Sequence, residues 1–154
     1  MKTIKGNLID LAETGAFDII VQGCNCFNTM GGGIAREIKQ RCPQAWEADC
    51  DTSSGDINKL GTYTQGWNNG GTYRIINAYT QYNMSGGEDV FEYASFEVIL
   101  RKLAHVYGVC QFGLPMIGMG LARGDKERIM RLLEKFDEAV TARGGTVTLV
   151  EFEK

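Results

Sequence analysis

Residues 23–40 read GCNCFNTMGGGIAREIKQ, and this stretch decides the fold class. An apolar run of strand length, FDIIVQGC at 17–24, leads into it, as in a strand that is buried on both faces. Three consecutive glycines follow at 31–33, and apolar residues then recur at helical spacing: Ile34, Ala35, Ile38 and Cys42. The chain is therefore expected to pass from a buried strand into a helix. Three glycines between them indicate that something approaches the backbone closely.

A second segment of the same kind lies in the last third of the chain. Residues 109–114 are predicted to form a short strand, and PMIGMGLARGD at 115–125 is predicted to be a loop. The helix after it has a clean apolar face: Ile129, Leu132, Leu133, Phe136 and Val140. In a parallel sheet, such loops lie at the carboxyl ends of the strands, where α/β folds bind ligands. We expect the two loops to lie side by side and to hold a diphosphate on backbone N–H groups and helix N-termini. The alternative for each loop is a tight strand-to-helix turn that binds nothing.

The remaining segments complete an alternating pattern. Strands are expected at 1–6, 61–67, 72–80 and 146–152, and helices at 8–13 and 93–107. Asn-Asn-Gly-Gly at 68–71 predicts a hairpin turn between two of the strands. Pro43 either ends the helix after the glycines or opens another one. Strands that alternate with helices predict a three-layer α/β/α fold with a mixed, mostly parallel sheet. With 154 residues, a single domain spanning 1–154 is expected.

Composition narrows the function classes. The chain has 19 acidic and 16 basic residues, and no Lys/Arg run gives the electrostatic footprint of a nucleic-acid-binding protein. No signal peptide is evident at the N-terminus, and no run reaches the ~18 apolar residues of a membrane span. A cytoplasmic location is expected, and nothing in the sequence requires more than a monomer.

The cysteine pattern and the absence of common nucleotide motifs exclude several kinds of site. The odd number of cysteines favours free thiols at Cys24, Cys26, Cys42, Cys50 and Cys110. No second ligand pair accompanies the Cys24-x-Cys26 pair, so neither a zinc site nor any other metal or cofactor is expected. The chain contains no P-loop motif, and its Gly-x-Gly comes too late for a dinucleotide-binding fingerprint. His105 lies within a predicted helix, away from both glycine loops.

Five motifs in order resemble the macrodomain family: GNL at 6–8, IIVQGCNC at 19–26, GGGIA at 31–35, IINAYTQ at 75–81 and PMIGMGLARGD at 115–125. The similarity spans residues 1–152. It is greatest to the small bacterial, phage and yeast macrodomains, a branch with ADP-ribose-1''-phosphate phosphatases and terminal ADP-ribose glycohydrolases. The resemblance implies a mixed sheet between helices, with ADP-ribose as a ligand that is held without metal.

The resemblance also implies the binding residues: Asn7, Leu8, Asn25, Gly31, Gly32, Gly33, Ile34, Ile117, Gly118, Met119, Gly120, Leu121 and Phe152. Asn7 stands where the family has an acid that meets the adenine amino group. Asn25 stands at the place of the distal-ribose asparagine, whose amide can both donate and accept. Phe152 lies near the position from which some members stack on adenine; the alternative is an edge-strand aromatic that packs in the core.

The sequence predicts the ligand more clearly than it predicts the reaction. Family members that remove ADP-ribose rely on a lysine just beyond the strand equivalent to IINAYT, where this chain has Thr80, Gln81 and Tyr82. They can also carry an aspartate where Ala122 stands. A lysine adduct is therefore not expected. The proposed catalytic residues are Asn25 and Asp125. Asp125 is expected to cap the last helix, or to orient a water for phosphate removal.

Three functions remain open at this point. The favoured one is a phosphatase that converts ADP-ribose 1''-phosphate to ADP-ribose and phosphate. The others are a hydrolase that removes ADP-ribose from protein or nucleic acid, and a non-catalytic ADP-ribose-binding module. Nucleic acid is expected as a partner only in the form of an ADP-ribosylated substrate. Slow turnover is expected, because no Cys-x5-Arg phosphatase motif is visible.

Overall fold

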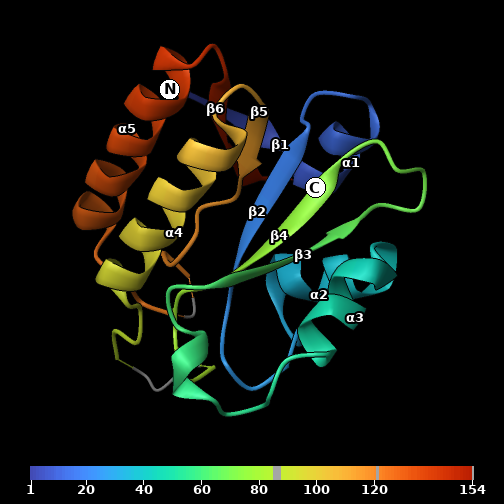
Figure 1. Cartoon of the computed structure of the whole chain (residues 1–154), viewed down its shortest axis with the longest axis vertical. Helices are drawn as coiled ribbons and strands as arrows, with labels where there is room; N and C mark the ends of the chain where they lie inside the picture. Colours follow the sequence, from blue (N-terminus) through green and yellow to red (C-terminus); the bar gives the residue numbers. More distant parts are fainter. Residues whose placement is uncertain (85–87, 121, 154) are drawn as a thin grey trace.

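The computed structural model describes residues 1–84, 88–120 and 122–153. Their elements follow one another along the chain as shown in Figure 1. In order they are β1 (Lys2–Gly6), α1 (Leu8–Glu13), β2 (Ile19–Cys24), α2 (Gly33–Arg41), α3 (Pro43–Cys50), the short 3-10 helix η1 (Ile57–Lys59), β3 (Tyr63–Trp67), β4 (Arg74–Tyr79), α4 (Tyr93–Tyr107), β5 (Gln111–Leu114), α5 (Lys126–Ala142) and β6 (Thr146–Phe152). Within these residues, no helix is both long and apolar enough to cross a membrane.

The strands form one mixed sheet in the order β1-β6-β5-β2-β4-β3. All neighbouring strands run parallel except β3 and β4, which form the antiparallel hairpin. The mostly parallel sheet predicted from the alternation of elements is confirmed. The parallel strands end at the same edge, and their carboxyl ends therefore form one continuous rim across the molecule.

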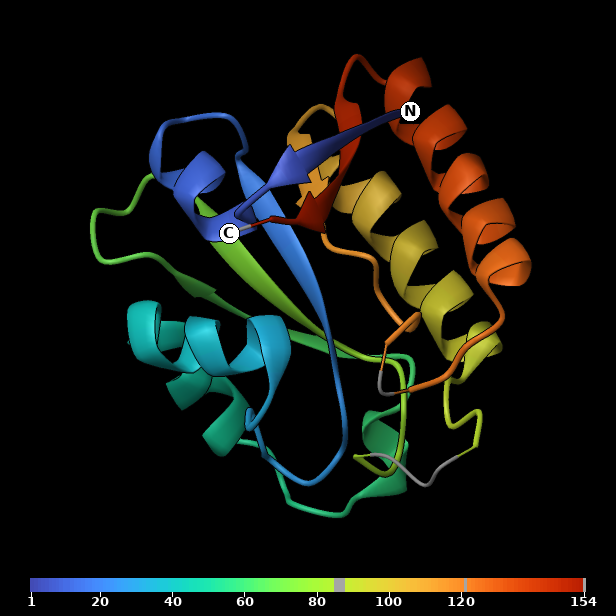
Figure 2. The same cartoon turned by 180° about the vertical axis from the view of Figure 1, so that it is seen from behind.

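Helices cover both faces of the sheet, which gives the expected three layers (Figures 1 and 2). Helices α4 and α5 pack on one face through buried side chains such as Phe96, Ile99 and Leu133. Helices α1, α2 and α3 pack on the other face, around Ile9, Ile38 and other buried side chains. The apolar spacing of the two long helices explains this packing, because residues three and four positions apart fall on one helical face.

Several predicted boundaries shift for local reasons. Pro43 opens α3 as its first residue, where its fixed φ and missing N–H cost nothing. The strand predicted from residue 72 begins at Arg74, because the Asn68 side chain accepts from the N–H groups of Thr72 (2.7 Å) and Tyr73 (3.0 Å). The strand predicted from residue 109 begins at Gln111.

One feature of the topology positions the candidate site. Strands β2 and β5 lie next to each other and run parallel, with Ile19 opposite Phe112 and Ile20 opposite Gly113. The loop from β2 to α2 and the loop from β5 to α5 therefore start side by side at one edge of the sheet. The expectation that the two glycine loops are neighbours is confirmed.

Candidate functional site

The first glycine loop connects β2 to α2 and places three glycines at the start of a helix. Gly32 is the N-cap of α2 in an extended conformation, and Gly33 has φ +56°, a conformation that favours glycine. Within the described residues, the amides of Gly31 and Gly32 donate to no protein acceptor. They lie at the positive end of the α2 dipole, which suits an anionic group.

The second glycine loop connects β5 to α5 and folds back on itself. Gly118 has φ +78°, and its carbonyl accepts from the Gly124 N–H at 2.7 Å. A side chain at Gly118 would meet the ring of Phe91, whereas the space around Gly120 is open. Gly118 is therefore required by the fold of the loop, while Gly120 leaves room for another molecule.

A cavity of about 570 Å³ lies between the two loops. Its lining contains six glycines and eight residues with uncharged side chains: Gly23, Cys24, Asn25, Thr29, Gly31, Gly32, Gly33, Ile34, Ala35, Gln81, Met84, Gly118, Gly120 and Ala122. No Lys, Arg, Asp or Glu occurs among these residues of the described chain. An anion in this cavity would therefore be held by backbone N–H groups and helix dipoles, as in other glycine-rich anion sites.

Asn25 reaches the cavity from a tight bend after β2. Its Oδ1 accepts from the N–H of Phe27 at 2.8 Å, and its Nδ2 donates to the hydroxyl of Thr29 at 2.7 Å. Thr29 lines the same cavity. The Nδ2 also donates to the Thr29 carbonyl at 3.4 Å. These bonds fix the amide orientation within its own loop, and the second lone pair of Oδ1 is left for a ligand.

Gln81 and Met84 form part of the wall that the sequence interpretation did not assign. Gln81 follows the end of β4, the other neighbour of β2 in the sheet. Its Nε2 donates to the carbonyls of Asn83 and Met84, both at 2.8 Å, which fixes the side chain. Gln81 follows closely on the end of a parallel strand, and this position could have predicted that it lies near the site. No comparable feature of the sequence predicts that Thr29 lines the cavity.

The residues expected at the adenine end, Asn7, Leu8 and Phe152, lie at the carboxyl ends of β1 and β6, and none of them lines this cavity. Phe152 pairs in register with Gly6, next to Asn7. Asn7 caps α1 by accepting from the N–H of Asp10, and its Nδ2 donates to Glu37 at 3.0 Å. Leu8 is only 3% exposed and packs in the core, so its side chain is not available to a ligand.

The sequence left two alternatives for Phe152, stacking on adenine or packing in the core, and the structure excludes the second. Its side chain is 65% exposed, and β6 lies between β1 and β5 rather than at the edge of the sheet. An aromatic ring that packs in the core is therefore excluded. The exposed ring remains free to stack on a flat ligand.

Several other predicted site residues do not line the cavity. Asp125 is the N-cap of α5, where its Oδ1 accepts from the Arg128 N–H at 3.2 Å. Its capping role is confirmed. It is exposed and absent from the cavity lining, so the structure does not support the catalytic assignment of Asp125. Ile117 is buried, Met119 packs against the same core, and Leu121 lies outside the described residues.

The cysteines are free thiols in the structure. Cys24 lines the cavity, and burial raises its pKa well above the usual value, so it is held as a neutral thiol at physiological pH. Burial also raises the pKa of the neighbouring Cys26. Among the described residues, no group of His, Cys, Asp and Glu side chains could hold a metal ion. His105 is exposed on α4.

Solved macrodomain structures share the fold of this chain. A macrodomain protein from Streptomyces coelicolor superposes with a TM-score of 0.70 at 20% identity, covering 97% of both chains. A Trypanosoma brucei macrodomain in complex with ADP-ribose superposes with a TM-score of 0.71 at 12% identity, covering 99% of this chain and 63% of that one. The sheet order and these likenesses show that the chain has the macrodomain fold.

Sequence comparison finds relatives with higher identity than these structures. The chain is 31% identical over 149 residues to the uncharacterized 17.5 kDa protein in the tk-vs intergenic region of Enterobacteria phage T4, covering 88% of this chain and 89% of that protein, and it belongs to the same family. A shorter match, 39% identical over 46 residues, is to an ADP-ribose 1''-phosphate phosphatase of Aspergillus oryzae. It covers 30% of this chain and 21% of that protein. No family model matches the chain.

Proposed function

We propose that this chain binds ADP-ribose along the carboxyl edge of its sheet, with the diphosphate between the two glycine loops. The observation that carries this proposal is the cavity itself, because loops from the adjacent strands β2 and β5 line it together. The uncommitted amides of Gly31 and Gly32 offer donors to phosphate oxygens. The remaining lone pair of the Asn25 Oδ1 is available to a hydroxyl of the distal ribose.

The adenine end would lie toward β1 and β6. From β6 to β4 the sheet order gives three strand spacings, or about 14 Å. That span suits a ligand with a nucleoside at one end and a second sugar at the other. In this orientation the exposed ring of Phe152 stacks on adenine, and Asn7 lies beside it.

We further propose that the chain hydrolyses ADP-ribose 1''-phosphate. Water attacks the phosphorus, the bond from phosphorus to the ribose oxygen breaks, and that oxygen takes the proton from the water. The products are ADP-ribose and inorganic phosphate. The backbone donors of the glycine loops would stabilise charge on the transferring group, and Asn25 would orient the water. The short match to the Aspergillus phosphatase supports this reaction over others.

The removal of ADP-ribose from protein or nucleic acid is the second candidate. It would require an activated nucleophile or base at the distal ribose. The wall at the end of β4 presents Gln81, a neutral amide whose Nε2 is already committed to two carbonyls. This observation favours the phosphatase. A non-catalytic binding module would use the same cavity.

One set of assays tests these functions. Purified protein is mixed with ADP-ribose 1''-phosphate, with an ADP-ribosylated protein and with ADP-ribosylated DNA, while calorimetry measures ADP-ribose binding. Release of phosphate supports the phosphatase, and release of ADP-ribose from either macromolecule supports the hydrolase. Binding without either product leaves the binding module, and no binding of ADP-ribose overturns the whole proposal.

A further inference from the structure

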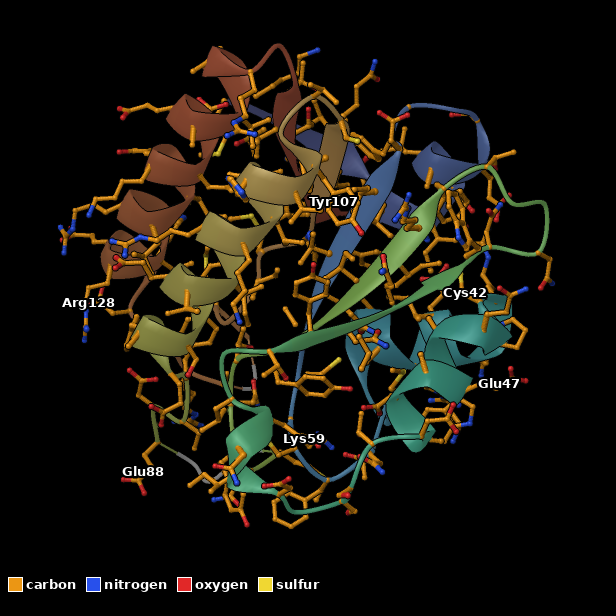
Figure 3. The ribbon with its side chains drawn as sticks, viewed as in Figure 1. Cys42, Glu47, Lys59, Glu88, Tyr107 and Arg128 are labelled. Carbon is orange, nitrogen blue, oxygen red and sulfur yellow. The ribbon has the colours of Figure 1, made fainter. Side chains whose placement is uncertain are left out.

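Lys59 is a buried cation that the proposed function does not use. It ends η1, and it is only 7% exposed. Figure 3 shows Lys59 at the end of η1, among the loops below the sheet. Lysine is among the residues least often buried, because a charged group loses much of its hydration in the protein interior. A buried ammonium therefore calls for a specific set of partners.

Those partners are neutral oxygens. The Nζ of Lys59 donates to the Oδ1 of Asn28 at 2.6 Å, to the carbonyl of Cys26 at 3.0 Å and to the carbonyl of Ser53 at 3.3 Å. These three acceptors match the three donors of an ammonium group. The ring of Tyr79 lies 5.0 Å away and adds a cation–π contact. Among the ion pairs of the described residues, none includes Lys59.

Two of these acceptors belong to the bend that carries Asn25. The carbonyl of Cys26 also accepts from the Gly55 N–H at 2.7 Å. Asn28 has φ +56°, an uncommon conformation for a residue with a side chain, and Thr52 holds its amide through two further bonds of 2.9 and 3.1 Å. The bend thus contacts the Lys59 ammonium through Cys26 and Asn28, and it lines the cavity through Asn25 and Thr29.

We infer that Lys59 is a positioning residue for ADP-ribose binding, which holds the bend at 25–29 so that Asn25 faces the cavity. This inference rests on the proposed function. Without the ammonium, the Cys26 carbonyl and the Asn28 side chain each lose a charge-assisted hydrogen bond, and the two bonds with Thr52 alone then hold the Asn28 amide. The bend relaxes, and the amide of Asn25 leaves its orientation. A lysine outside the cavity thereby controls how the distal ribose is bound.

The test compares Lys59→Met, which keeps the length of the side chain but removes the charge, with Lys102→Met as the matched control. Lys102 donates to the Gly61 carbonyl at 3.1 Å from an exposed position and does not contact the bend. Calorimetry well below the melting temperature is expected to show an affinity for ADP-ribose at least tenfold weaker in Lys59→Met and unchanged in Lys102→Met. The affinity for ADP, which lacks the distal ribose, should change less than threefold. Equal losses for both ligands, or no loss for either, would overturn the inference.

A second variant covers the case in which Lys59→Met does not fold. Asn28→Gly keeps the backbone conformation, since glycine accepts φ +56°, but removes the shortest acceptor of Lys59. It should weaken ADP-ribose binding selectively as well, and an unchanged affinity would refute the positioning role. If both variants fold, the double variant should bind no more weakly than the weaker single one, because both act through the same bend. Fully additive losses would argue against that common route.

Hydrogen exchange in the absence of ligand separates this inference from the proposed function. The amides of Phe27 and Gly55, which donate to Asn25 and Cys26, should exchange at least tenfold faster in Lys59→Met than in the wild type. If the wild type fails to bind ADP-ribose, the proposed function falls, and this exchange still decides whether Lys59 holds the bend. Unchanged exchange at both amides would overturn the role of Lys59.

Discussion

The Nδ2 of Asn25 donates to the hydroxyl of Thr29 at 2.7 Å, across the bend that lines the cavity. This bond and the one from the Phe27 N–H leave the amide with one fixed orientation. A ligand therefore meets a preset acceptor and does not have to order the side chain itself. Such preorganisation lowers the entropic cost of binding.

Replacement of Asn25 by alanine should weaken ADP-ribose binding about tenfold or more, because one or two hydrogen bonds to the ribose are lost. Calorimetry measures the change. Asn58→Ala is the matched control, since Asn58 is exposed on η1 and its side chain does not line the cavity. If Asn25→Ala binds as tightly as Asn58→Ala, Asn25 does not contact the ligand.

Two glycines of the second loop should respond in opposite ways. At Gly120, no heavy atom lies within 4 Å of the place of a Cβ, so Gly120→Val should keep the melting temperature and reduce ADP-ribose affinity at least tenfold by filling the cavity. At Gly124, a Cβ would lie 2.6 Å from Ile129 Cδ1 and 2.7 Å from the Gly118 carbonyl. Gly124→Ala should lower the free energy of unfolding by about 1–3 kcal/mol. Calorimetry and urea denaturation of both variants give the two readouts, and destabilisation by Gly120→Val would show that this space is not open.

Asp125 allows capping to be separated from catalysis. Asp125→Ala should lower the free energy of unfolding by about 1 kcal/mol, because the Arg128 N–H loses its acceptor, whereas Asp125→Asn should retain the cap. Since the side chain does not line the cavity, phosphate release from ADP-ribose 1''-phosphate should be unchanged in Asp125→Asn. A loss of turnover in this variant at unchanged stability would restore the catalytic role that the sequence indicated.

These cases show what the sequence could and could not predict. Periodicity and turn residues predicted α1, α2, α4, α5, the hairpin and the two glycine loops, because each is a property of neighbouring residues. They left α3 as one of two alternatives and missed η1. The place of both loops at the carboxyl edge followed from the general behaviour of parallel sheets, whereas the adjacency of β2 and β5 is known only from the structure. Contacts between distant residues left no local signal. Asn7 and Glu37 lie 30 positions apart, and Lys59 reaches Cys26 across 33 positions. Lysine side chains are usually exposed, so no pattern in the sequence predicts that Lys59 is buried.

The exposed ring of Phe152 tests the proposed direction of the ligand. Phe152→Ala should weaken binding of both ADP-ribose and ADP severalfold, because the stacking of adenine is common to them, while Phe152→Tyr should restore it. The free energy of unfolding should hardly change, since the side chain is 65% exposed. Val109→Ala, at another exposed apolar side chain, serves as the control. Equal affinities in Phe152→Ala and the wild type would place adenine elsewhere.

The carboxyl group of Asp49 should make stability depend on pH. It is 1% exposed, and burial raises its pKa, although the bond from the Tyr79 hydroxyl and the charge of Lys59 act in the opposite direction. Because the pKa in the folded state lies above the unfolded value of about 4, the folded state binds the proton more tightly. The contribution of Asp49 is therefore full below pH ~4 and is lost as the pH rises through the folded pKa. Urea denaturation between pH 4 and 7 should show the wild type losing stability relative to Asp49→Asn as the pH increases. A constant difference between the two proteins would mean that Asp49 has the same pKa in the folded and unfolded states.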